Sequence, residues 1–448
     1  MKSKSVCVLG AGLCGVSVTW QQENFGKKVH LIEASNRLGG VLQSKKENGY
    51  LLDYGANTFN LRLQETNDLL KKMGVLNHAV DANPKANKRF IVRNGKIIPL
   101  PQSIFSFLTS NFLSPIGKLR LFLEPFIAKG NFNGNESVSE FIKRRLGKEA
   151  LDYCANPFIG GIYASKPESL SLAHAFPSLY EMEKNSRSIF LGSIKAKSER
   201  KNIAKSRLIS FTNGMEEIVS LISSEIKSKV SMGHKVVKIE KLEMGWKISS
   251  RFKNNHLIEN IYDEVVCTLP AHKLQDIEWK GLKRSENIEI ISNTPDYPLN
   301  LVYLGFDREQ VKKDLDGFGF LVPSKENMNI LGALFSSTLF PDRAPKGKVL
   351  LTAFVGGERM SGLTELNDLQ TYDLVLKDLS KLLKIDGTPD FKHIKRWKRG
   401  IPLPDNQMGI RKHAAQQLER SNPGLTFSGS HLTGVSLPNC LKAEYSNS

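Results

Sequence analysis

A glycine-rich turn directly after the first apolar run constrains this chain more than any other feature. Residues 6–9 are all apolar and predict a buried parallel strand, which leads into a G-x-G-x-x-G spacing. The first glycine permits a tight turn, the second lets backbone approach a pyrophosphate, and the third lets a helix pack closely on the strand. The N-terminus of that helix offers free N–H groups to the phosphates. The turn consists of Gly10, Ala11, Gly12, Leu13, Cys14 and Gly15.

A second strand and a second glycine pair extend this pattern. The second predicted strand, at 29–32, ends in a glutamate, at the spacing where a carboxylate accepts hydrogen bonds from ribose hydroxyls. An arginine and two glycines follow, placed to touch the same pyrophosphate from its other side. No second G-x-G-x-x-G occurs, so we expect no nicotinamide domain and an electron acceptor such as oxygen or a quinone. The candidate contacts here are Glu33, Ala34, Arg37, Gly39 and Gly40.

Composition narrows the class of protein. The chain has 448 residues, 40% hydrophobic and 24% charged, as expected for a globular protein of two or three domains. Its five cysteines form no C-x-x-C pair and its nine histidines show no H-x-x-x-H spacing, so we expect no metal site and no disulfide framework. The net charge of +18 favours an anionic membrane surface or an acidic substrate as partner, and a merely lysine-rich composition is the alternative. No nucleic-acid-binding motif is present.

Two segments bear on membrane contact. Residues 103–128 are rich in Phe and Leu and are broken by Pro115 and Pro125. This composition is compatible with three interpretations: buried core, the lining of an apolar tunnel, or a segment in a membrane interface. Residues 193–207 carry six basic residues against one acid and predict a solvated loop, with lipid contact as the alternative. No leader peptide and no transmembrane run are expected, which favours a cytoplasmic protein that associates peripherally with membranes.

The two glycine clusters together resemble the FAD-dependent oxidases and desaturases of the amine-oxidase type. Longer segments resemble the protoporphyrinogen oxidase family, most closely its mitochondrial plant type. The resemblance covers nearly the whole chain and implies a flavoenzyme of haem biosynthesis that oxidises protoporphyrinogen IX to protoporphyrin IX with molecular oxygen. The segments are residues 55–58, 88–95, 110–114, 123–126, 169–177, 181–184, 317–326, 334–337, 340–345 and 354–357.

The resemblance also implies roles for residues around the substrate. Arg89 would pair with a substrate propionate, for which a guanidinium is suited. The apolar side chains of Leu321, Leu334 and Phe354 would sandwich the macrocycle. Gly160 and Gly161 would let the macrocycle approach backbone. No residue stands out as a general acid or base, because hydride transfer to a flavin mainly requires orientation.

Further cofactor contacts follow from the same resemblance. A turn formed by Gly55, Ala56, Asn57 and Thr58 would lie near the flavin, and Val237 or its neighbour would contact adenine through backbone. Val435, Ser436 and Leu437 would open the last helix beneath the isoalloxazine. The nearby glycine turn at 428–431 has no cysteine, so we expect FAD to bind non-covalently.

The predicted fold is α/β, with a discontinuous Rossmann-like FAD-binding domain, a sheet-based substrate domain and a membrane-associating helical insertion. We assign residues 1–86, 206–286 and 396–448 to the first, 87–100 and 287–395 to the second, and 101–205 to the third.

Three alternative functions remain open at this point. The chain could oxidise coproporphyrinogen III to coproporphyrin III, or be another flavoenzyme of the amine-oxidase superfamily. It could also be a non-catalytic flavin- or porphyrin-binding protein, because the proposed reaction needs no unmistakable catalytic residue. Whether the chain forms a homodimer is equally open.

Overall fold

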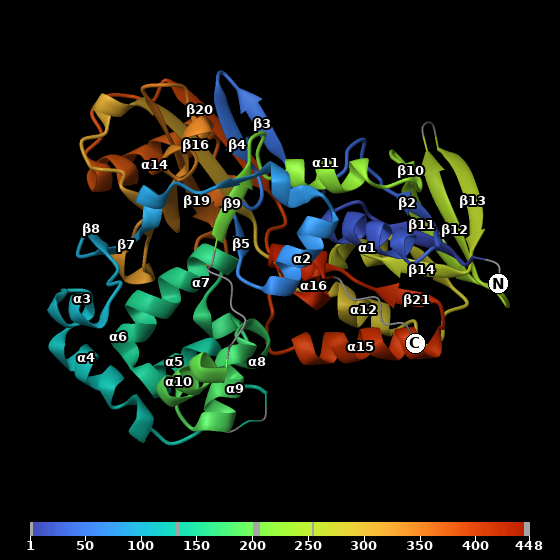
Figure 1. Cartoon of the computed structure of the whole chain (residues 1–448), viewed down its shortest axis with the longest axis horizontal. Coiled ribbons are helices and arrows are strands. Elements are labelled where there is room, and N and C mark those ends of the chain that lie inside the picture. The colour runs from blue at the N-terminus through green and yellow to red at the C-terminus, as the bar shows by residue number, and fades with distance from the viewer. Residues whose placement is uncertain (1–2, 131, 133, 200–206, 253–254, 443–448) are drawn as a thin grey trace.

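The computed structural model describes residues 3–130, 132, 134–199, 207–252 and 255–442. Two large sheets and a group of helices make up this mixed α/β protein (Figure 1). In that view the sheet that contains the strand before the glycine-rich turn lies to the right, and the larger sheet lies at the upper left. The helices of residues 101–199 lie at the lower left.

A five-stranded parallel sheet contains the predicted first two strands. Its strands are, in spatial order, β10 (Lys229–Ser231), β2 (Lys28–Ile32), β1 (Ser5–Leu9), β14 (Glu264–Cys267) and β21 (Leu425–Phe427). Successive residues of β1 point into different cores, as strand geometry requires. Val6 and Val8 pack toward helices α1 (Leu13–Asn24) and α11 (Glu217–Ser224). Cys7 and Leu9 pack toward α12 (Asn287–Ser292) and α15 (Met408–Ser421).

Helix α12 packs on the parallel sheet. Its residues fall in the range that we assigned to the substrate domain. However, Ile288 and Ile291 are buried in the same cluster as Leu418 of α15, on the side of the parallel sheet. The apolar face of the helix therefore belongs to the core of the parallel sheet.

A seven-stranded mixed sheet forms the second body. Its order is β20 (Phe391–Trp397), β16 (Leu299–Asp307), β19 (Lys348–Gly356), β18 (Gly332–Phe335), β17 (Gly317–Leu321), β7 (Lys88–Arg93) and β8 (Lys96–Pro99). Asn94 and Gly95 connect β7 to β8 with φ values of 52° and 70°, the positive values that a two-residue hairpin turn requires and that an Asn-Gly pair favours. Helix α14 (Asp368–Leu383) covers one face of this sheet.

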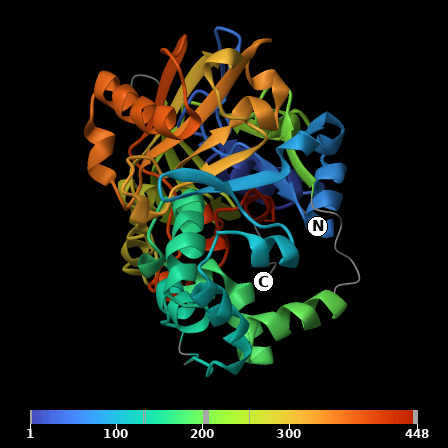
Figure 2. The same cartoon turned by 90° about the vertical axis from the view of Figure 1, so that its left-hand side faces the viewer.

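The structure corrects two predictions for the helical segment. Helices α3 (Ile104–Thr109) and α4 (Pro115–Phe122) bury no side chain, so the interpretation of 103–128 as core is wrong for them. Phe105 is 77% exposed and Ile116 81%, because both helices lie at the left edge of the molecule in Figure 1, the side that faces the viewer in Figure 2. The basic stretch is not all loop. Helix α10 runs from Ile189 to Glu199 because Ser188 caps it and its residues favour helix, and residues 200–206 lie outside the described part.

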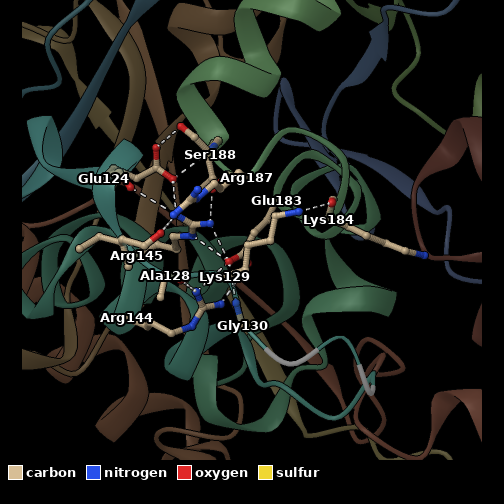
Figure 3. Close-up of polar contacts among 12 residues, drawn as sticks. Glu124, Ala128, Lys129, Gly130, Arg144, Arg145, Glu183, Lys184, Arg187 and Ser188 are labelled. Atoms are coloured by element: carbon tan, nitrogen blue, oxygen red, sulfur yellow. Dashed lines mark hydrogen bonds and ion pairs between the residues drawn. The ribbon is translucent and has the colours of Figure 1, made fainter.

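A buried ion network holds the helical segment together (Figure 3). Arg145 and its partners Glu124 and Glu183 are fully buried, with ion-pair distances of 3.2 Å and 2.7 Å. Arg144 donates to the same Glu183 at 2.8 Å. These residues come from α5 (Val138–Leu146), α9 (Pro177–Ser186) and the turn after α4, so the network fixes three segments. None of the helices that the structure describes has the length and apolar character needed to cross a bilayer.

Candidate active site

The two glycine clusters lie against each other at the start of α1. Gly12 is the N-cap of α1 and has no side-chain cap, and a β-carbon on it would meet no atom within 4 Å. The Gly39 N–H donates to the Ala11 carbonyl at 2.7 Å, and a β-carbon on Gly40 would lie 3.2 Å from the Gly12 α-carbon. The helix N-terminus therefore faces open space bordered by glycine backbone, which suits an approaching phosphate.

Glu33 ties the end of β2 to the first turn. One carboxylate oxygen accepts from the Ala11 N–H at 2.8 Å and the other from the Ser35 N–H at 2.7 Å. The carboxylate stands beside the turn, as the fingerprint predicts, and Ala34 next to it is exposed. The structure adds that backbone N–H groups orient this carboxylate.

Arg37 holds the second glycine loop in place. Its guanidinium donates to the carbonyls of Gly40 at 2.8 Å and Leu42 at 2.6 Å, and pairs with Glu216 at 2.9 Å. Glu216 in turn accepts from the Ser44 N–H at 2.7 Å. Because the guanidinium is hydrogen-bonded to these protein groups, Arg37 fixes the conformation of the loop at 39–42.

Most other predicted cofactor residues gather around the same helix. The turn at 55–58 packs on the loop after Gly40, because a β-carbon on Gly55 would overlap the Val41 carbonyl oxygen. The Asn57 side chain donates to the Gly55 carbonyl at 3.3 Å, and Ala56 and Leu437 pack on the core beneath α1. Thr58 is half-buried in the same turn.

The remaining predicted cofactor residues lie at the start of the last described helix and in a β-bulge. Ser436, after Val435, caps α17 (Leu437–Leu441) by accepting from the Asn439 N–H at 3.3 Å. Helix α17 is tied to α1 by a 2.7 Å bond from the Ser17 hydroxyl to the Leu441 carbonyl. Val237 lies apart, as an unpaired bulge residue of β11 (Lys235–Lys241). That strand belongs to a four-stranded sheet with β13 (His256–Tyr262), β12 (Trp246–Phe252) and β15 (Glu278–Lys280). A bulge leaves backbone groups free for another partner.

The predicted substrate residues share one face of the seven-stranded sheet. Leu321 pairs with Ile91 and with Gly332, Gly332 pairs with Phe354, and Leu334 pairs with Gly319. Directly paired residues point to the same face, and so does Arg89, two residues before Ile91. Leu321, Leu334 and Phe354 are each partly exposed, whereas Phe320 and Ala333 on the opposite face are buried toward α14.

Helix α7 (Asn156–Tyr163) lies against this face. A β-carbon on Gly161 would stand 2.6 Å from a methyl group of Leu321, and one on Gly160 would stand 3.2 Å from a guanidinium nitrogen of Arg359. Arg89 at the other end of the face is exposed, with its guanidinium 4.9 Å from the Phe318 ring centre. The structure therefore brings an arginine, three apolar side chains and two glycines to one apolar surface.

Sequence reasoning missed a basic and an aromatic residue between the two sheets. The Trp397 indole N–H donates to the Tyr54 carbonyl at 2.8 Å. The Lys395 ammonium lies 4.4 Å from the Trp397 ring centre and donates to Gln43 at 3.1 Å. Burial, with Arg37 nearby, lowers the pKa of Lys395. In the sequence, only the spacing of two residues between Lys395 and Trp397 indicates that both side chains lie on the same face of a strand.

Comparisons with known proteins agree on a family. The family model of flavin containing amine oxidoreductases matches residues 13–443. The mitochondrial protoporphyrinogen oxidase of Nicotiana tabacum is 33% identical, over 98% of this chain and 93% of that protein. The coproporphyrinogen III oxidase of Bacillus subtilis is 27% identical, over 98% and 96%. A crystal structure of reduced UDP-galactopyranose mutase superposes with a TM-score of 0.73 at 15% identity, over 98% and 92%, which bears on the fold alone.

The chain belongs to the flavin-containing amine oxidoreductase family. It is an FAD-dependent oxidoreductase, and the residues present fit the cofactor. The uncapped N-terminus of α1 beside Gly12, Gly39 and Gly40 would take the pyrophosphate, and Glu33 would take the adenosine ribose. Bound FAD supplies the acceptor for a hydride.

Proposed function

We propose that this flavoenzyme oxidises protoporphyrinogen IX to protoporphyrin IX, with molecular oxygen as electron acceptor, as a step of haem biosynthesis. The observation that carries the proposal is the sheet face on which Arg89, Leu321, Leu334 and Phe354 lie together opposite Gly161. A flat apolar macrocycle with an acidic side chain matches such a surface. The similarity to the tobacco protoporphyrinogen oxidase supports the same substrate.

Each residue of this face has a physical role in the proposal. The Arg89 guanidinium, which has no carboxylate partner among the described residues, would bind a propionate through charge-assisted hydrogen bonds. The apolar side chains would hold the macrocycle plane, and Gly161, which lets Leu321 pack closely on α7, would fix the position of Leu321 in that surface. Binding and orientation are what the chain must provide, because a misplaced donor carbon loses its reactive geometry.

An anaerobic mixing experiment tests the proposal. Purified, FAD-loaded protein is mixed with protoporphyrinogen IX, and loss of the oxidised flavin absorbance is followed. We expect rapid bleaching, and recovery of the absorbance with protoporphyrin formed once oxygen is admitted. No bleaching with protoporphyrinogen IX would overturn the proposal, and no bleaching with any porphyrinogen would favour a binding protein without catalysis.

Coproporphyrinogen III is the second candidate substrate. The Bacillus subtilis coproporphyrinogen III oxidase matches nearly the whole chain. The net charge of +18 suits a substrate with four carboxylates. The same mixing experiment separates the two, because the faster-bleaching porphyrinogen identifies the substrate.

We propose further that the chain is cytoplasmic and binds anionic membranes through its helical segment. Helices α3 and α4 and the turn after α4 expose a set of large apolar side chains next to Lys118 and Arg120. Apolar side chains flanked by cations are typical of interfacial helices. We call this set the apolar rim: Ile104, Phe105, Leu108, Ile116, Leu119, Phe122, Leu123 and Phe126.

A further inference from the structure

We propose that Arg359 is a second carboxylate-binding residue of the substrate site, at the opposite end of the apolar face from Arg89. The proposal deepens the proposed function and rests on it. It assigns to the site a flat apolar ligand that carries two carboxylates. Nothing in the sequence motifs pointed to this residue.

Arg359 lies where α7 meets the sheet. It follows β19 and the turn Gly356-Gly357, and its Nη1 donates to the Val322 carbonyl at 2.9 Å, just beyond β17. The same nitrogen would be 3.2 Å from a β-carbon on Gly160. Because Gly161 next to it contacts Leu321, the guanidinium borders the face that we assign to the macrocycle.

The charge of Arg359 has no protein counter-ion. Within the described residues, no carboxylate lies within ion-pair distance of its guanidinium, whereas the buried Arg145 contacts two and the buried Arg343 contacts one. The neighbouring Glu358 is turned away, because it accepts from Ser165 and Ser169 at 2.5 Å each. Burial alone, with no opposing acid, lowers the pKa of Arg359 to about 10. A half-buried cation without a partner is costly unless an anion joins it.

The spacing of the two arginines fits one ligand. Lys88 pairs with Gly317 and Phe90 with Phe320, so a bulge in β17 leaves both Phe318 and Gly319 opposite Arg89. Arg359 binds the carbonyl of Val322, three residues beyond Gly319. At about 3.3 Å per residue the two positions are about 10 Å apart along the strand, with Leu321 between them. A macrocycle lying on Leu321 would thus present carboxylates to both cations.

The experiment compares free acid and ester. Kinetics of the FAD-loaded wild type and of Arg359→Gln are measured with protoporphyrinogen IX and with its dimethyl ester, which lacks the negative charges. We expect the KM for the acid to rise roughly tenfold to a hundredfold in Arg359→Gln, with the KM for the ester unchanged. Arg359→Lys should recover part of the loss, because it keeps the charge without the bidentate geometry.

Controls separate binding from folding. Arg396→Gln removes a guanidinium that pairs with Asp368 at the surface, and it should leave both KM values at wild-type levels. Equal losses for acid and ester in Arg359→Gln, or an unchanged KM for the acid with flavin fully bound, would overturn the inference. If Arg359→Gln does not fold, Arg359→Lys and Arg359→Met decide by the same comparison.

A binding measurement keeps the inference distinct from the proposed function. Affinities for protoporphyrin and its dimethyl ester are measured by tryptophan fluorescence without turnover. A wild type that prefers the acid, with the preference lost in Arg359→Gln, would support the inference even if no porphyrinogen were oxidised. Equal affinity of the wild type for acid and ester would overturn it.

Discussion

Gly15 faces the carbonyl oxygen of Gly10 so closely that a β-carbon on Gly15 would overlap that oxygen. Three residues earlier, Gly12 has no protein atom within 4 Å of its β-carbon position and adopts φ −67° and ψ 179°, which any residue tolerates. The two glycines of one motif therefore serve different purposes. Gly15 lets helix and strand pack together, and Gly12 keeps space for a ligand.

This difference predicts opposite outcomes for the same substitution. Gly12→Val should fold with the melting temperature of FAD-free wild type but lose FAD, because its methyl groups occupy the phosphate space. Gly15→Val should lower the melting temperature strongly, because β1 and α1 must separate. Flavin absorbance per protein and thermal unfolding check both. A fully yellow Gly12→Val would contradict the assignment of the phosphate site.

Arg89 and Phe354 should affect different kinetic constants. Arg89→Ala should raise KM roughly tenfold to a hundredfold, since a charge-assisted contact contributes about 1.5–3 kcal/mol. Phe354→Ala should also lower kcat, because the macrocycle plane is held less firmly. Arg62→Ala, on an exposed arginine, is the control. Wild-type kinetics in Arg89→Ala with flavin bound would remove Arg89 from the site.

The apolar rim should determine vesicle binding. Sedimentation with anionic liposomes at low salt should carry down the wild type, and Phe105→Ser with Ile116→Ser should leave the protein in the supernatant. Each Lys or Arg near anionic lipid contributes about 1 kcal/mol, so binding of the wild type should weaken in high salt. Leu257→Ser removes an equally apolar but distant exposed side chain of β13 (His256–Tyr262) and should change nothing. Wild type that stays in the supernatant would contradict membrane binding.

The buried network of the helical segment should make a large contribution to stability. Glu183→Gln leaves Arg144 and Arg145 with less negative charge around them, and the loss of one buried partner costs about 3–5 kcal/mol. Asp81→Asn, which breaks an exposed pair with Arg207, should cost less than about 1 kcal/mol. Urea unfolding of both variants gives the comparison. Equal costs would show that the network is not a stabilising unit.

His431 should make stability depend on pH. Burial lowers its pKa from 6.5 to about 4, so between these values the unfolded chain binds the extra proton. The contribution is fully present above pH 6.5 and is lost as pH falls, by about 2 kcal/mol between pH 7 and pH 5. His431→Leu should reduce this loss, whereas His256→Gln at an exposed position should not. An unchanged pH dependence in His431→Leu would refute the assignment.

Local chemistry explains which parts the sequence could predict. The turn at Gly10–Gly15 and the hairpin at Asn94-Gly95 depend on backbone conformations that few residue types permit. Their positions can therefore be predicted from the sequence. The environment of Arg359 could not be predicted from the sequence. Arg359 lacks a counter-ion because the neighbouring Glu358 accepts hydrogen bonds from Ser165 and Ser169, which are almost two hundred residues away in the chain. The apolar rim likewise has a core-like composition, and only tertiary packing leaves it exposed.

The strand order of the parallel sheet also determines when contacts in the glycine-rich turn can form during translation. The Thr268 hydroxyl, which bonds the carbonyls of Leu9 and Gly10, enters the chain 259 residues after the strand that it secures. At about 5–20 residues per second, a ribosome needs on the order of tens of seconds to supply it. β21, which borders β14, follows later still. The turn therefore gains this contact only after more than half of the chain has been made, so flavin loading is expected to follow synthesis.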